Sequence, residues 1–222
     1  MFLEIPDLLT AAEVDELVRI GATSKFVDGR ATNPHSKVKN NLILADQEAY
    51  KRSSQIMFDA LRRSDEFNNW AFPKTMAQPW LTKYAAPSGS YGVHTDVAFM
   101  QQPGGRPLRS DLSCTIYLTS PDSYDGGELI VHLGAKQVEI KGAAGSAIVY
   151  PSNTLHEVRG VTRGERLVGL TFIESRLADP QQRDLLYELN EVAALEGLNM
   201  SWENYTRLQR VQMCLLRLWA GS

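Results

Sequence analysis

Six short runs of β-forming residues in the middle of the chain constrain its fold more than any other feature. Turn signals separate them, among others Pro87-Ser88-Gly89 and Asp125-Gly126-Gly127. Many short strands at regular spacing are typical of a β-sandwich, a jelly roll or a barrel. The runs are, in order, WLTKYA, DLSCTIYLT, GELIVHL, KQVEIK, SAIVYP and RLVGLTFIES. We therefore predict a mostly β core.

Helical patterns flank this β region on both sides. Thr10 and Glu13 have the spacing of a capping box, in which each side chain accepts a hydrogen bond from the other residue's backbone N–H. An apolar stripe follows at helical spacing, and Gly21 is a stop signal. A second helix is expected to begin near Asp46 and a last helix near Ser201. The sequence therefore predicts helices before and after the β core.

We expect a single domain, because 222 residues are enough for one buried core and no linker or internal repeat interrupts the chain. Residues 1–178 would form this domain, with a helical part over about 1–75 and the β core over about 78–178. Residues 179–222 would be its helical C-terminal extension, in which Pro180 suits the first turn of a helix.

Charge and hydropathy exclude several classes of protein. The net charge is −3 and the pI is near 5.8, which argues against nucleic-acid binding. The first residues lack a signal-peptide pattern, and no apolar run approaches the roughly 20 residues that cross a bilayer. Cys114 and Cys214 lack a zinc or redox spacing, so we expect two buried, reduced thiols. These features predict a soluble, cytoplasmic protein without a membrane partner.

Three residues together have the composition of a metal site. His94 and Asp96 are two positions apart, so in a strand both side chains point to the same face. Alone, this pair is most simply a surface histidine beside an aspartate. His156 lies 60 residues beyond Asp96, where the second half of a jelly roll would bring it to the first pair. Two imidazoles and one carboxylate on one octahedral face leave three positions open, as in non-haem Fe(II) sites.

Arg166, ten residues after His156, suits a cosubstrate with two carboxylates. One end of a keto acid would occupy two of the open metal positions, O2 would occupy the third, and the planar guanidinium would pair with the far carboxylate. The simpler interpretation of Arg166 is a solvated arginine at a strand edge. Tyr84 and Tyr117 could donate hydrogen bonds to the same cosubstrate, although either could be an ordinary core aromatic residue.

Four segments carry a resemblance to the PKHD-type hydroxylases, bacterial relatives of the prolyl 4-hydroxylases in the iron/2-oxoglutarate dioxygenase superfamily. They cover most of the chain, in the order and at the spacing of the family. The segments are VKNN (38–41), YAAPSGSYGVHTDVA (84–98), RSDLSCTIYLTSPDSYDGGELIV (109–131) and YPSNTLHEVRGVTRGERLVGLTFIESRLAD (150–179).

The resemblance implies a double-stranded β-helix, or jelly-roll, core with N-terminal and C-terminal helices packed around it. It also implies that His94, Asp96 and His156 bind iron, that Arg166 binds 2-oxoglutarate and that Tyr84 lines the cosubstrate pocket. The implied cofactors are Fe(II), 2-oxoglutarate and O2, with L-ascorbate as a reductant. The chain departs from the family pattern mainly in residues 99–108 and in the C-terminal helices, which leaves the substrate and the oligomeric state open.

The predicted function is hydroxylation of an unactivated C–H bond, with release of succinate and CO2, on a small-molecule or peptidyl substrate such as a prolyl or amino-acid-like group. The carboxylate of Asp96 favours hydroxylation over halogenation, since related halogenases have a small residue there. A non-catalytic module that senses metal or 2-oxoglutarate is one alternative. A zinc hydrolase is another, but its base would be Glu157, which strand alternation points away from the face of His156.

Several further residues are candidates for a role at the site. The Gly- and Pro-rich residues 99–108 follow the ligand pair and could form a lid, and we hypothesise that Phe99 and Arg106 help to select the substrate. His132 lacks a partner at ligand spacing and is more simply a histidine at a strand end, and His35 is most simply a loop residue. Arg109 and Asp111 more simply form a structural pair, and Asp125-Gly126-Gly127 a turn.

The last helix leaves homodimer formation open. Its apolar residues recur at near-heptad spacing, a pattern that more often packs on its own domain than on a partner. These residues are Leu208, Val211, Leu215 and Leu218.

Overall fold

The computed structural model describes residues 2–32, 36–102 and 104–220. Its largest element is an eight-stranded sheet in which the paired strands are antiparallel. Its strands lie in the order β1 (Leu3–Ile5), β13 (Ala147–Pro151), β10 (Leu112–Tyr117), β15 (Glu165–Ser175), β6 (Trp80–Ala85), β4 (Leu42–Leu44) and β2 (Phe26–Asp28), with β5 (Pro73–Met76) paired to β15.

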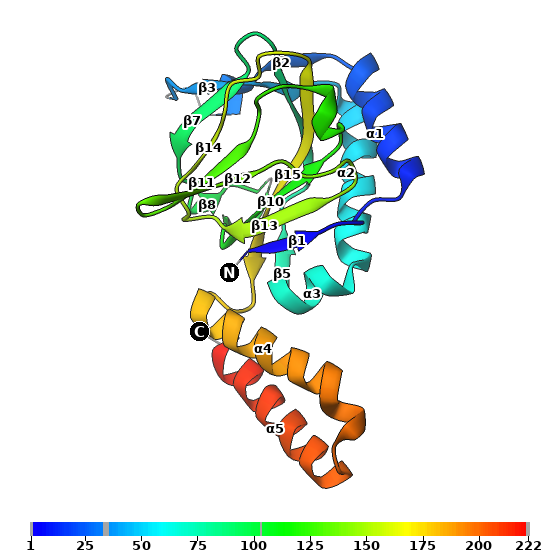
Figure 1. The fold of residues 1–222 in the computed structure, drawn as a ribbon, viewed down its shortest axis with the longest axis vertical. Helices are drawn as coiled ribbons and strands as arrows, with labels where there is room; N and C mark the ends of the chain where they lie inside the picture. Colours follow the sequence, from blue (N-terminus) through cyan, green and yellow to red (C-terminus); the bar gives the residue numbers. More distant parts are fainter. Residues whose placement is uncertain (1, 33–35, 103, 221–222) are drawn as a thin grey trace.

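A second, five-stranded sheet faces the first and carries part of the candidate metal site (Figure 1). Its order is β12 (Lys136–Ile140), β11 (Leu129–Leu133), β14 (His156–Val158), β7 (Ser90–His94) and β3 (Lys39–Asn40). Strands far apart in the sequence are neighbours in both sheets, as in a jelly roll. The predicted mostly β fold with a jelly-roll core is therefore confirmed.

Residues 99–108, predicted as a loop, contain a short β-hairpin within the described residues. Its strands are β8 (Phe99–Met100) and β9 (Leu108–Arg109), which pair only with each other. The Gly and Pro content of this segment suggested a connector because single-sequence patterns cannot report a two-residue pairing. The segment leads from the metal-site residues to β10, so it lies beside the cavity described below.

Three helices, α1 (Ala11–Thr23), α2 (Gln47–Arg63) and α3 (Asp65–Ala71), precede the central strands. The capping box at α1 is present: the Thr10 side chain accepts from Glu13 N, and Glu13 accepts from Thr10 N at 2.8 Å. Asp46 caps α2 as the sequence predicts. Helix α2 packs against β6 and α1 against α2, and their apolar side chains join one core with those of the large sheet.

The C-terminal helices α4 (Pro180–Glu196) and α5 (Trp202–Trp219) form a hairpin that extends away from the β body (Figure 1). Asp179 caps α4 and Ser201 caps α5, in agreement with the sequence. The hairpin is joined to the body through contacts between α3 and α4. None of the described helices is long and apolar enough to cross a membrane.

The Asp125-Gly126-Gly127 segment, predicted as a turn, pairs with Arg163 through Asp125, bends at Gly126 and leads into β11. Gly126 has a φ of +73°, and a Cβ there would lie 2.0 Å from the carbonyl oxygen of Gly160. Gly134 has a similar φ of +64° but has nothing within 4 Å of its Cβ position. An alanine at Gly134 would therefore meet backbone strain alone, whereas an alanine at Gly126 would meet both backbone strain and a steric clash.

We predict that Gly126→Ala lowers the free energy of unfolding more than Gly134→Ala does. Left-handed backbone alone should account for about 1–2 kcal/mol at each position, and the clash with Gly160 for a further 1–3 kcal/mol, roughly, at Gly126. Urea denaturation of both variants checks this. Equal losses would show that the approach to Gly160 relaxes at little cost.

Candidate metal centre

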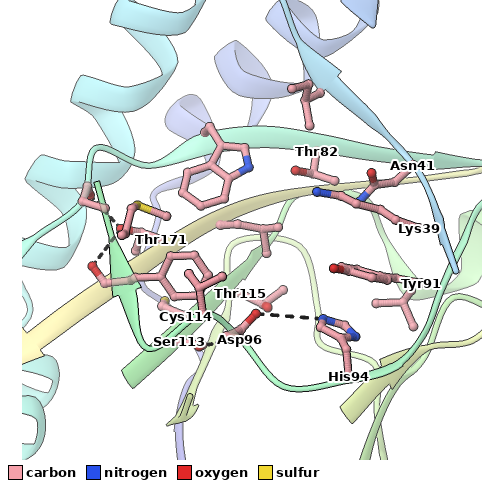
Figure 2. Close-up of a pocket in the computed structure, with 18 of the residues that line it drawn as sticks. Lys39, Asn41, Thr82, Tyr91, His94, Asp96, Ser113, Cys114, Thr115 and Thr171 are labelled. Carbon is pink, nitrogen blue, oxygen red and sulfur yellow. Dashed lines mark hydrogen bonds and ion pairs between the residues drawn. The ribbon is translucent and has the colours of Figure 1, made fainter. Parts of the chain in front are cut away.

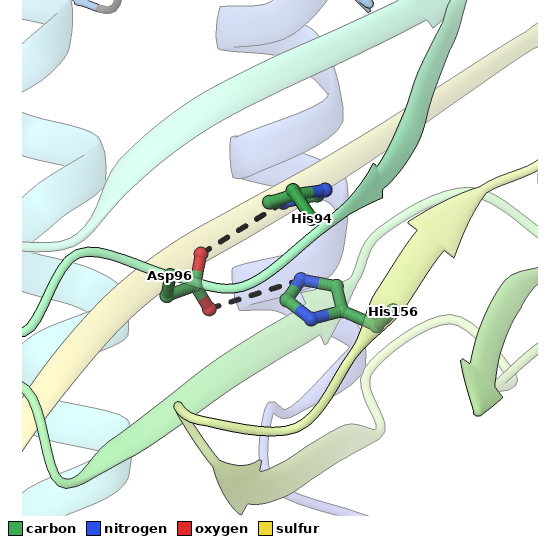
Figure 3. A group of neighbouring side chains, drawn as sticks. All are labelled: His94, Asp96 and His156. Atoms are coloured by element: carbon green, nitrogen blue, oxygen red, sulfur yellow. Dashed lines mark ion pairs between the residues drawn. The ribbon is translucent and has the colours of Figure 1, made fainter. Parts of the chain in front are cut away.

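The two histidines of the predicted metal site come from adjacent antiparallel strands of the small sheet. His94 is the last residue of β7, His156 is the first residue of β14, and the two are directly paired. Asp96 lies two residues beyond the end of β7, so it reaches the same place from a loop rather than from the strand predicted for it. One ligand atom from each of the three residues lies within 4.8 Å of the others (Figure 3).

Hydrogen bonds to the main chain fix the orientation of both imidazoles. Nδ1 of His94 lies 2.8 Å from the carbonyl oxygen of Gly92, and Nδ1 of His156 lies 3.0 Å from that of Thr154. A carbonyl can only accept, so each Nδ1 carries the proton and each Nε2 keeps its lone pair. The Nε2 atoms lie 3.9 Å (His94) and 3.8 Å (His156) from the nearer oxygens of Asp96.

The surroundings of His94 favour its neutral, metal-binding form. Burial and the neighbouring His156 lower the pKa of His94 to about 4. The ring of Tyr91 stacks on it with a centroid distance of 3.6 Å. Two neutral imidazoles and a carboxylate form the donor set of a mononuclear non-haem Fe(II) site, and this set leaves metal positions open for other ligands. The residues present therefore fit an iron ion.

These side chains line one wall of a cavity of about 610 Å³ between the two sheets. This volume is in the range of sites for small molecules. Figure 2 shows His94 and Asp96 on one side of the cavity and Thr82 and Asn41 on another. Arg166 also lines it, and its side chain comes from β15 of the large sheet. The predicted cation and the predicted metal ligands therefore share one space.

Arg166 is a buried cation whose donors are largely unused. It is 1% exposed, and its Nε and Nη1 atoms have no hydrogen-bond partner among the described residues. Its Cζ lies 5.0 Å from the centre of the Tyr84 ring and 5.7 Å from that of Tyr117. Ring faces stabilise a cation only in part, and a buried charge without a hydrogen-bonded partner is unfavourable. The arrangement therefore fits an anion that pairs with the guanidinium.

Three tyrosines surround this guanidinium. Tyr84 is directly opposite Arg166 in the β6–β15 pair, and its hydroxyl accepts a hydrogen bond from Asn41 Nδ2 at 3.1 Å. The hydroxyls of Tyr117 and Tyr124 are buried beside Arg166, and neither makes a hydrogen bond of normal geometry within the described part of the chain. Burial raises the pKa of Tyr117 to about 12, against the opposing effect of the Arg166 charge, so this hydroxyl keeps its proton at neutral pH.

The sequence predicts a role at the cosubstrate for Tyr84 and Tyr117 but none for Tyr124. Tyr124 directly precedes the Asp125-Gly126-Gly127 turn, and the turn signal gave no reason to place its side chain near Arg166. Gly127 is the structural link: a Cβ there would lie 3.0 Å from the Tyr124 ring and 3.1 Å from Arg166 Cδ. The second glycine of the turn therefore leaves room for both side chains.

The cluster does not include His132, Arg109 or Asp111, for which the sequence favours no metal role. Nε2 of His132 lies 3.4 Å from Glu157 Oε1, so Glu157 points away from His156, as alternation predicts. This geometry gives the zinc-hydrolase alternative no base at the metal. Arg109 and Asp111 form an ion pair at 2.7 Å, and Asp111 also accepts from Ser175 N, which is a structural arrangement. His35 lies outside the described residues.

The expectation of two buried thiols is right for one cysteine and wrong for the other. Cys114 is buried and lines the cavity, and burial raises its pKa to about 12. Cys214 is exposed, because it lies on α5 of the protruding hairpin. Both thiols are free.

Comparison with known proteins agrees with this geometry. Residues 79–174 match the family model of the 2OG-Fe(II) oxygenase superfamily. A PKHD-type hydroxylase of Sphingopyxis alaskensis is 53% identical over 97% of this chain and 98% of its own length. A PKHD-type hydroxylase of Stenotrophomonas maltophilia strain R551-3 is 37% identical over 99% of both chains.

Solved structures share the fold at lower identity. A prolyl-4-hydroxylase of Pseudomonas putida superposes with a TM-score of 0.54 at 21% identity, over 78% of this chain and 92% of its own. A 2OG-Fe(II) oxygenase family protein of Burkholderia pseudomallei gives a TM-score of 0.57 at 19% identity, over 77% and 82%. At this level the likeness supports the jelly-roll fold.

We predict that Arg166→Met makes the ligand-free protein more stable while strongly reducing the stabilisation that an added dicarboxylate confers. Replacing an unpaired buried cation by an apolar side chain of similar length should raise the free energy of unfolding by about 1–3 kcal/mol. Denaturation with and without 2-oxoglutarate measures both effects. The control is Arg163→Met, which removes an exposed pair with Asp125 and should leave the free energy of unfolding nearly unchanged. A marked loss of stability in Arg166→Met would show that Arg166 is satisfied without an anion.

Proposed function

We propose that this chain, which belongs to the PKHD-type hydroxylases of the 2OG-Fe(II) oxygenase superfamily, binds iron through His94, Asp96 and His156 and hydroxylates an unactivated C–H bond. It is a 2-oxoglutarate-dependent dioxygenase, and its cofactors are Fe(II), 2-oxoglutarate and O2. The observation that carries the proposal is the position of Arg166, a buried cation with unused donors on the cavity that the three ligands line.

The metal ligands, Arg166 and the tyrosines around it have separate roles in this proposal. The Nε2 atoms of His94 and His156 and one oxygen of Asp96 would hold the metal. Arg166 binds the far carboxylate of 2-oxoglutarate, with the hydroxyls of Tyr117 and Tyr124 as additional donors. Iron bound there would supply the oxidation of a C–H bond, coupled to conversion of 2-oxoglutarate and O2 into succinate and CO2. The walls of the cavity exclude bulk water from that reaction.

Tyr84 takes a position next to both Arg166 and the metal side of the cavity. Because Asn41 Nδ2 donates to its hydroxyl, the hydroxyl proton of Tyr84 is free to point toward a bound cosubstrate. Tyr84 is fully buried, and burial raises its pKa above the usual value, so it remains a donor. We propose that it hydrogen-bonds to 2-oxoglutarate, and we include L-ascorbate as a reductant on the family resemblance alone.

The wall of the cavity away from Arg166 is suited to the prime substrate. The rings of Trp80 and Phe172 lie 5.7 Å apart there, and Met100, Gln101 and Gln102 belong to the same lining. Aromatic faces with neighbouring amides fit a peptidyl, prolyl or amino-acid-like group better than a highly charged one. The solved relative from Pseudomonas putida is a prolyl-4-hydroxylase. We therefore propose that the prime substrate carries a peptidyl, prolyl or amino-acid-like group.

Phe99 and Arg106 remain a prediction as substrate-selecting residues. Phe99 is 60% exposed and Arg106 is also exposed, and neither belongs to the cavity lining in this structure. The part of that segment that does line the cavity is Met100, Gln101 and Gln102. A lid formed by residues 99–108 would need to move before Phe99 could reach a substrate.

We further propose that residues 1–178 are the dioxygenase domain, that residues 179–222 are its helical extension, and that the enzyme acts in the cytoplasm as a homodimer. Among the described residues, the hairpin holds a large share of the exposed apolar side chains, an unusual concentration for a monomer surface. These are Leu185, Val192, Leu195, Leu198, Trp202, Val211, Met213 and Leu218.

Charge on the hairpin favours a second copy as the partner. Helix α4 carries four acidic residues and Arg183, for a net charge of −3, whereas α5 carries three arginines and Glu203, for a net charge of +2. In a two-fold dimer, α4 of each copy can face α5 of the other, so that opposite charges meet twice. The hairpin of one chain is therefore complementary in charge to the hairpin of a second copy.

We predict that anaerobic addition of Fe(II) and 2-oxoglutarate to the metal-free protein gives a visible charge-transfer band, and that admitting O2 then gives succinate. Asp96→Ala should abolish turnover with an unchanged circular dichroism spectrum, because it removes one of three ligands. Arg166→Met should raise the KM for 2-oxoglutarate roughly 10- to 100-fold, the loss of one charged hydrogen-bonding group. A band without succinate would favour the sensing module. The absence of both the band and succinate would contradict the proposal.

We predict that charge reversal on either helix alone produces monomers, and that mixing the two variants restores a dimer. Glu188→Lys with Glu191→Lys makes both helices basic, and Arg207→Glu with Arg210→Glu makes both acidic. Each variant should repel itself and attract the other, as light scattering after size exclusion would show. The control variant reverses the charges of Lys51 on α2 and Lys136 on β12, outside the hairpin, and should leave the dimer intact. Monomeric wild-type protein would contradict this part of the proposal.

A further inference from the structure

A serine of the large sheet holds the carboxylate of the metal site. Ser113 Oγ donates a hydrogen bond to Asp96 Oδ2 at 2.6 Å, and Ser113 is 3% exposed (Figure 2). Ser113 lies on β10, whereas both histidines come from the small sheet. This hydrogen bond therefore ties the metal-site carboxylate to the sheet opposite the two imidazoles.

A second serine fixes the direction of this hydrogen bond. Ser152 Oγ lies 2.7 Å from Ser113 Oγ, and Ser152 is 2% exposed. An ionised carboxylate only accepts, so the single hydroxyl proton of Ser113 goes to Asp96 and Ser152 must donate to Ser113. The carbonyl oxygen of Ser152 also accepts from Asp96 N at 3.2 Å. The two serines thus hold both the side chain and the backbone of Asp96.

The hydrogen bond matters because both oxygens of Asp96 face the imidazoles. Oδ1 lies 3.9 Å from His94 Nε2, and Oδ2 lies 3.8 Å from His156 Nε2. A carboxylate presented in this way can bind a metal through both oxygens, which would use a fourth coordination position. Two imidazoles and one carboxylate oxygen use three, and a keto acid with O2 needs the other three. A short charge-assisted hydrogen bond to Oδ2 favours the coordination of Oδ1 alone.

We propose that Ser113, supported by Ser152, is a positioning residue that restricts Asp96 to coordination through one oxygen and so keeps a third metal position open. This inference rests on the proposed iron site, since it assigns Asp96 as a ligand. Partners that hydrogen-bond to metal ligands commonly change metal affinity or activity 10- to 100-fold, roughly, when they are removed. Ser113 touches neither cosubstrate nor substrate in this role and acts through Asp96.

The test uses Mn(II) alone, without 2-oxoglutarate, so that turnover is not needed. The broadening of the Mn(II) electron paramagnetic resonance signal in ¹⁷O-water counts the water molecules on the metal. Wild type should hold three waters, one for each open position. Ser113→Ala should hold two and should bind Mn(II) roughly 10-fold more weakly. Ser113→Thr keeps the hydroxyl and should restore both values.

Two further variants separate positioning from a merely structural role. Ser110→Ala is the matched control, because Ser110 is also buried and its hydroxyl has no partner in the described part of the chain. It should keep three waters and wild-type affinity. Ser113→Cys preserves size with a weak donor and should resemble Ser113→Ala, which keeps the test valid if alanine packs poorly. Ser152→Ala should add nothing to Ser113→Ala, because Ser152 acts through Ser113.

The outcomes distinguish this inference from the proposed function. Three waters and unchanged affinity in Ser113→Ala, with Mn(II) bound normally by wild type, would overturn the role of Ser113 and leave the iron site intact. If Asp96→Ala binds Mn(II) as well as wild type does, both the role of Ser113 and the proposed iron site are overturned. Loss of the third water in Ser113→Ala with rescue by threonine supports the inference.

Discussion

The antiparallel pairing of β7 with β14 is the constraint on which the site depends. It sets His94 directly opposite His156, so that two imidazoles converge although 62 positions separate them in the sequence. A register slip of one residue would turn every side chain of a strand to the other face and would separate the pair. Nδ1 of each histidine faces the carbonyl oxygen two residues before it, so the same local geometry orients both rings.

The large sheet contributes the other half of the site by a similar principle. Register between β6 and β15 places Tyr84 opposite Arg166, and register between β10 and β15 places Tyr117 opposite Val168, close to the same guanidinium. The jelly roll therefore brings the candidate metal ligands, beside the small sheet, against the buried Arg166 of the large sheet. The unpaired cation is unfavourable in the free protein, and we propose that a bound dicarboxylate relieves it. Such local disagreement between burial and charge is expected at functional sites.

The sequence predicted the parts of the site that residue type and spacing can carry. His94, Asp96, His156 and Arg166 are residue types that bind metals and anions, and their order and spacing together indicated this chemistry. It gave no such indication for Tyr124 and Ser113, because tyrosine before a turn and serine in a buried strand are common for other reasons. Their roles follow only from sheet closure, which brings Ser113 to Asp96 across 17 positions. The exposure of Cys214 likewise depends on a hairpin that projects from the body, which periodicity cannot indicate.

In our proposal the candidate metal ligands and Arg166 act on one molecule of 2-oxoglutarate. An anaerobic crystal structure with Mn(II) and 2-oxoglutarate tests this most directly. We predict metal bound by His94, Asp96 and His156, one end of 2-oxoglutarate on the metal, and the far carboxylate on the Arg166 guanidinium. A metal bound elsewhere, or a 2-oxoglutarate carboxylate that does not reach Arg166, would contradict the proposal.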